Sequence, residues 1–154
     1  MTWNAFRTRG AILRDVSAVA DARPDGTVPW DMDGLARAFA DELDLVGALQ
    51  LRWHTRLTGR IERELMHQPI DLEHAVITAW RATAHDLPGI RAIVDRHREQ
   101  PLGREMAEAM SAATTKEHEL LAVMAGRASL GDPLAAGAGA EIEARARAHV
   151  VLAA

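Results

Sequence analysis

The chain has 154 residues, enough for one domain with a substantial core, and its 48% hydrophobic and 26% charged residues are typical of a folded globular protein. A formal net charge of −4 does not favour a dedicated binder of nucleic acid or of an anionic membrane surface. The absence of cysteine excludes disulfides, a thiol nucleophile, zinc–thiolate fingers and iron–sulfur clusters. No apolar run approaches the roughly 20 residues that span a bilayer, so the sequence predicts a cytoplasmic protein without a membrane anchor.

Helical periodicity runs through almost the whole chain, and no segment shows the alternation with a period of two that marks a β-strand. The first segment predicts a helix over residues 2–22, capped by Thr2 and with Trp3 and Phe6 on its apolar side. The sequence Arg23-Pro24-Asp25-Gly26 then predicts a turn, because proline presets φ and glycine tolerates a positive φ.

The second predicted helix begins at Asp31 or Asp33 and continues to about His67, and Pro69 stops it. On a helical projection its apolar face consists of Leu35, Phe39, Leu43, Val46, Trp53, Leu57 and Ile61. Proline, glycine and aspartate punctuate the rest of the chain and predict further helices over 71–86, 88–99, 101–128 and 133–154.

Short connections between these helices determine the expected architecture. The segments 31–67, 71–99 and 101–128 are the longest, with lengths of roughly 40–50 Å at about 1.5 Å per residue. Links of only a few residues force consecutive helices to lie antiparallel. The sequence therefore predicts an all-α protein, an elongated antiparallel bundle of five or six helices in a single domain over residues 1–154.

Motifs of the common catalytic and nucleotide-binding sites are absent from the sequence: there is no P-loop, dinucleotide-binding glycine fingerprint, HExxH, GxSxG or EF-hand pattern. The sequence accordingly favours a protein that is not an enzyme, and it predicts no cofactor. Among short motifs, Glu64-x-x-His67 has the spacing used in di-iron bundles and suggests a metal site, with Asp71-x-x-His74 as the nearest second copy. A turn decorated with solvated charges is the favoured interpretation of these four residues.

Arginines in two segments suggest binding of an anion. Arg52, Arg56, Arg60 and Arg63 share a helical face that could clamp a phosphate or a carboxylate, although ion pairs along the helix, such as Arg60 with Glu64, explain the stripe better. Leu87-Pro88-Gly89 could be the turn of a helix-turn-helix, and its DNA contacts would then be Arg91, Arg96 and Arg98. The acidic net charge favours a bend within the bundle instead.

Polar residues within the apolar faces give the best functional lead, because burial of an unpaired polar group costs free energy. Folding the helices about their turns places five of them at one level, walled by Trp53 and Trp80: Gln50, His54, Thr83, Glu117 and Arg145. In this predicted polar layer a Glu117–Arg145 pair would fix the register of the bundle. The alternatives are a pocket for a small anion or amide, or a metal or catalytic site built on His54 and Glu117.

The sequence thus predicts a non-enzymatic binding or interaction protein that forms a homodimer. Self-association is expected because Leu45, Leu51 and Ile77 lie outside the main apolar faces, and a twofold partner commonly buries such leftover surface. The first alternative is a bundle that binds a small ligand or a metal in the predicted polar layer. The second is a DNA-associated regulator.

Overall fold

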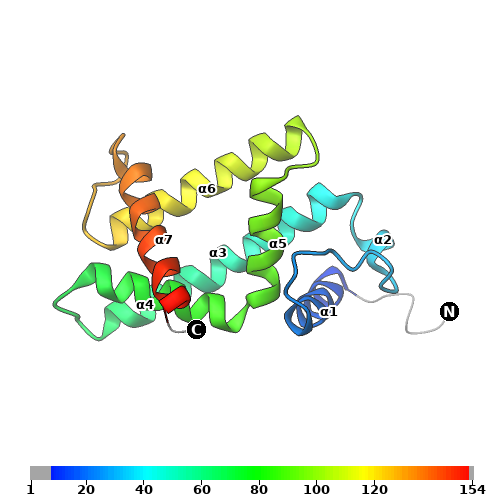
Figure 1. The fold of residues 1–154 in the computed structure, drawn as a ribbon, viewed down its shortest axis with the longest axis horizontal. Coiled ribbons are helices and arrows are strands. Elements are labelled where there is room, and N and C mark those ends of the chain that lie inside the picture. Colours follow the sequence, from blue (N-terminus) through cyan, green and yellow to red (C-terminus); the bar gives the residue numbers. More distant parts are fainter. Residues whose placement is uncertain (1–7, 153–154) are drawn as a thin grey trace. The chain divides into compact units, whose positions relative to one another are not determined.

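The computed structural model describes the backbone of residues 8–152 and the side chains of residues 8–148. Within this range the regular structure is entirely helical, which confirms the predicted all-α class (Figure 1). The helices are α1 (Arg9–Ala22), α2 (Leu35–Ala38), α3 (Glu42–Met66), α4 (Leu72–Asp86), α5 (Pro88–Glu99), α6 (Arg104–Met124) and α7 (Ala135–Leu152). None of them combines the length and the apolar character that a bilayer-spanning helix needs.

The helices form two compact units. Unit 1 comprises residues 1–53 and 87–109, and unit 2 comprises residues 54–86 and 110–154. Helices α3 and α6 each contribute residues to both units. A single domain over 1–154 stays a prediction.

In unit 1, α1 packs on α5 and on the short α2 (Figure 1). The two helices come close at Gly89 in the first turn of α5, where a Cβ would lie 2.3 Å from the carbonyl carbon of Ala20. The Gly89 N–H donates to Asp21 Oδ1 at 2.8 Å, so one hydrogen bond ties the end of α1 to the start of α5. The apolar core of unit 1 includes Ile12, Val16, Leu35, Phe39, Leu49, Ile90 and Ile93.

The first helix begins later than the sequence predicts. Thr8 is its N-cap, with extended backbone and a side-chain oxygen that accepts from the Ala11 N–H at 3.1 Å. This hydroxyl satisfies one of the donors that a helix start leaves open. The predicted helix over 2–22 therefore does not run unbroken through Thr8, and its predicted cap Thr2, with Trp3 and Phe6, lies outside the described residues.

The second predicted helix is also wrong in its first part, because it divides into α2 and α3. Phe39 leaves the helical conformation (φ −126°, ψ 130°) with only 1% of its surface exposed, and Asp41 Oδ1 then accepts from the Asp44 N–H at 2.8 Å. This break resets the helical phase. Leu45, predicted to lie off the apolar face, is fully buried, whereas Leu43 is only half-buried.

In unit 2, α4 packs on α7, and α7 approaches the backbone of α6 at Gly139 (Figure 1). The core includes Leu57, Ile61, Val76, Trp80, Leu121, Ile142 and Ala146. Ile77, expected off the apolar face, is 9% exposed and belongs to the buried residues. Helix α6 ends at Met124 rather than near 128, since Gly126 takes a left-handed φ of 70° that closes a C-terminal cap.

Candidate binding groove and buried polar cluster

The residues of the predicted polar layer differ widely in exposure. Trp53, Trp80, Thr83 and Glu117 are buried, Gln50 and His54 are half-buried, and Arg145 is exposed. The buried Thr83 hydroxyl donates to Ala79 O at 2.8 Å within its own helix. A shared site for these residues stays a prediction, since Gln50 and Trp53 belong to unit 1 and the others to unit 2.

The structure corrects the predicted partner of Arg145. Its guanidinium forms a close ion pair with Glu73 and a second with Glu141 at 4.0 Å, so the predicted Glu117–Arg145 pair is wrong. The buried positions of α7 include Ala135, Ile142 and Ala146, and Arg145 lies outside this buried face. The composition of α7 makes its buried face difficult to recognise from the sequence. Alanine and glycine occupy both buried and exposed positions of α7, so its sequence pattern has little contrast.

A buried polar cluster does exist in unit 2, built on Glu143 of α7, which is 7% exposed. Glu143 Oε2 lies 3.3 Å from His118 Nε2 of α6, and Glu143 Oε1 accepts from the Arg147 guanidinium at 3.4 Å. Arg147 in turn lies 4.9 Å above the ring of Trp80 on α4. The cluster therefore ties α4, α6 and α7 together through one carboxylate and one cation.

The sequence does not reveal the burial of Glu143, because the small residues of α7 do not mark its buried face. A second cross-tie lies beside the cluster: the Arg81 side chain of α4 donates to the carbonyl oxygens of Ala146 at 3.1 Å and Arg145 at 3.3 Å. Each of these polar groups is used in holding helices together. These hydrogen bonds and ion pairs therefore have a structural role, which is to hold α4, α6 and α7 together.

The weak metal candidates lie at the turn between α3 and α4. His67, Asp71 and His74 are exposed and Glu64 is half-buried. Asp71 Oδ1 accepts from the His74 N–H at 3.0 Å, which makes Asp71 the cap of α4. Among the side chains that the structure describes, no group of three or more His, Asp or Glu lies close enough to hold a metal ion.

Arg91, the first of the three arginines predicted to contact DNA, is buried inside unit 1 instead. Arg91 is 6% exposed, its guanidinium lies 4.5 Å from the centre of the Trp53 ring, and it pairs with Asp95 at 2.7 Å. A guanidinium held between a ring and a carboxylate does not reach a phosphate backbone, so this assignment of Arg91 is wrong. The neighbouring Arg96 is exposed and lies 3.5 Å from Thr27 Oγ1, while Arg98 lies 3.8 Å from Asp95.

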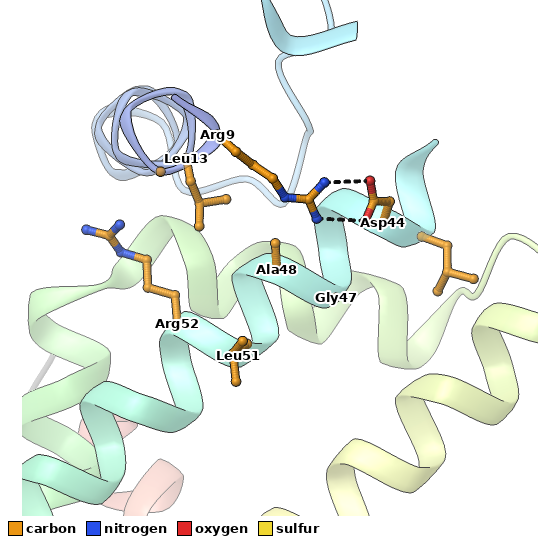
Figure 2. A pocket seen from close by; sticks show the side chains of 9 residues that line it. Arg9, Leu13, Asp44, Gly47, Ala48, Leu51 and Arg52 are labelled. Carbon is orange, nitrogen blue, oxygen red and sulfur yellow. Dashed lines mark hydrogen bonds and ion pairs between the residues drawn. The ribbon is translucent and has the colours of Figure 1, made fainter. Parts of the chain in front are cut away.

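A groove of about 690 Å³ runs between α1 and α3 in unit 1 (Figure 2). Its walls are mostly aliphatic, and the side chain of Leu51 is 65% exposed. A Cβ added at Gly10 or Gly47 meets no atom within 4 Å, so the groove is open to solvent above both glycines. The lining residues are Arg9, Gly10, Leu13, Leu43, Asp44, Gly47, Ala48, Leu51 and Arg52.

The two ends of the groove differ in charge pairing. Arg9 donates both terminal nitrogens to the Asp44 carboxylate, at 3.0 and 2.8 Å, as the dashed lines in Figure 2 show. Asp44 also accepts from the Ala40 N–H at 3.0 Å. The Arg9 hydrogen bonds, and then the Ala40 N–H, hold the pKa of Asp44 below its ordinary value. Arg52, at the other end, forms no ion pair with any side chain that the structure describes.

The lowered pKa of Asp44 predicts a dependence of stability on pH. A carboxyl group whose folded-state pKa is depressed stabilises the fold fully above its unfolded-state pKa and loses that contribution as the pH falls through the folded-state pKa. We expect Asp44→Asn to be less stable than the wild type at about pH 6, and the difference to shrink below about pH 3.5. Urea unfolding at both pH values measures it. An equal difference at the two pH values would show that the Asp44 charge contributes nothing.

No protein-family model, curated protein or solved structure matches this chain. The groove and the polar cluster of the chain itself are therefore the basis for a functional proposal.

Proposed function

We propose that this chain is a non-enzymatic interaction protein that works in the cytoplasm as a homodimer. The supporting observation is the groove between α1 and α3, which leaves aliphatic surface open to water beside Leu51. Exposed concave apolar surface is typical of a place where another molecule binds.

The polar groups of the molecule support interaction rather than catalysis. In the groove, the Arg9 guanidinium and the Asp44 carboxylate already form a bidentate ion pair with each other. In unit 2, His118, Glu143 and Arg147 contact one another as ties between helices. Polar side chains that bond to one another between helices are typical of a rigid scaffold whose surface binds another molecule.

A homodimer also suits the other exposed aliphatic side chains. Besides Leu51, the large exposed apolar side chains include Met66 at the end of α3 and Ile70, Leu130 and Leu134 in the connections of unit 2. Surface of this kind on a small protein is commonly buried by a second copy.

Multi-angle light scattering on the purified chain tests the proposal. One copy has a mass of 16.8 kDa, so we expect about twice that mass at micromolar concentration and dissociation on dilution. A mass of one copy at every concentration would contradict it. Native mass spectrometry on the same sample separates a protein dimer from a monomer that retains a small ligand.

A further inference from the structure

The homodimer proposed above needs a contact surface, and α3 carries one that is complementary to itself. Asp44, Ala48 and Arg52 follow one another at intervals of four residues and all line the groove. Residues at this spacing form one ridge along a helix, the kind of ridge that helices most often use in packing. In Figure 2, Ala48 lies between the Arg9–Asp44 pair and Arg52.

The charges of this ridge are antisymmetric about Ala48. An acid lies four residues before it and a base four residues after it. A twofold axis through Ala48 would run a second α3 antiparallel to the first, with each Arg52 opposite the partner's Asp44. From this symmetry we propose that the groove is the dimer interface and is filled by α3 of a second copy, with Ala48 on the twofold axis.

The hydrogen-bonding capacity of both ends fits this arrangement. A carboxylate accepts about four hydrogen bonds, and Asp44 accepts three, two from Arg9 and one from the Ala40 N–H. One acceptor site is left, on Oδ1, for the partner's Arg52. Arg52 has no ion pair within the described residues, so the dimer would supply its counter-charge.

The shape of the groove fits a helix as well. Gly47 and Ala48 have small side chains or none, which lets a second backbone come close. The exposed Leu51 then has an aliphatic surface to pack against.

The chain has no cysteine, which allows a direct test of the register. A residue on a twofold axis meets its own copy, so we expect Ala48→Cys to form an intermolecular disulfide on mild oxidation. Gly59→Cys is the matched control, because Gly59 is an exposed position of the same helix outside the groove. It should remain largely monomeric on a non-reducing gel.

Filling the groove tests the surface without cross-linking. Gly47→Trp places an indole where a Cβ meets nothing within 4 Å, so the fold accepts it while the groove is blocked. Gly59→Trp has the same open surroundings and makes the same change in helix propensity. We expect Gly47→Trp to raise the dimer dissociation constant at least about tenfold and Gly59→Trp to leave it unchanged.

Reversing a charge tests the pairing. Arg52→Glu sets a like charge opposite the partner's Asp44 and should also weaken the dimer roughly tenfold or more, with Arg56→Glu as the control on the same helix. If the wild type is a dimer, but Ala48→Cys does not cross-link and Gly47→Trp stays dimeric, the interface is elsewhere and this inference fails while the homodimer stands. If the wild type is monomeric at every concentration, the proposed function itself fails.

Discussion

We expect Gly139→Ala to destabilise unit 2 by about 3 kcal/mol or more, a large effect for the addition of one methyl group. A Cβ at Gly139 would lie 1.8 Å from the carbonyl oxygen of His118 and 2.3 Å from its carbonyl carbon. These are backbone atoms of α6, which cannot rotate away as a side chain can. Helix α7 would therefore have to move off α6, and the contacts of Glu143 with His118 would be lost.

Gly137→Ala is the matched control on the same helix, because a Cβ there meets nothing within 4 Å. It should gain up to about 1 kcal/mol, since alanine loses less conformational entropy than glycine on entering a helix. Urea unfolding followed by circular dichroism measures both variants. Equal stabilities of the two variants would show that α7 does not lie against the α6 backbone.

The helical class and most helix ends could be predicted from the sequence, because proline, glycine and capping residues have strong local preferences. Pro88 begins α5 as a first helical residue, and Asp71 caps α4. The break at Phe39 could not be predicted in this way. An apolar residue at a helical spacing fits the periodic pattern equally well whether its own backbone is helical or extended.

The candidate site was harder to predict for a related reason. Periodicity finds a helix face by the contrast between large apolar and polar side chains, and α7 buries small residues such as Ala135 and Ala146 beside Ile142. At Gly139 the close approach depends on the absence of a side chain, which carries no hydrophobic signal. Gly47 lines the groove, and it too carries no hydrophobic signal. Burial of Glu117 could be predicted because α6 contrasts methionine and leucine with polar residues.

We expect Glu143→Ala to cost about 2–3 kcal/mol of unfolding free energy, because it removes a carboxylate that is 7% exposed and leaves two donors behind. His118 Nε2 and the Arg147 guanidinium lie 3.3 and 3.4 Å from its oxygens. Neither regains full hydration when the carboxylate is removed, since the His118 side chain is 12% exposed and that of Arg147 is 37% exposed.

Glu141→Ala is the matched control for Glu143→Ala, two residues earlier on α7. Glu141 also pairs with arginine, at 3.0 Å from Arg127, but its side chain is 59% exposed. Water replaces such a surface pair at little cost, so we expect a loss below about 1 kcal/mol. Chemical unfolding of the two variants in the same buffer gives the comparison. A loss for Glu143→Ala no larger than that for Glu141→Ala would contradict the role of Glu143 as a buried tie between α6 and α7.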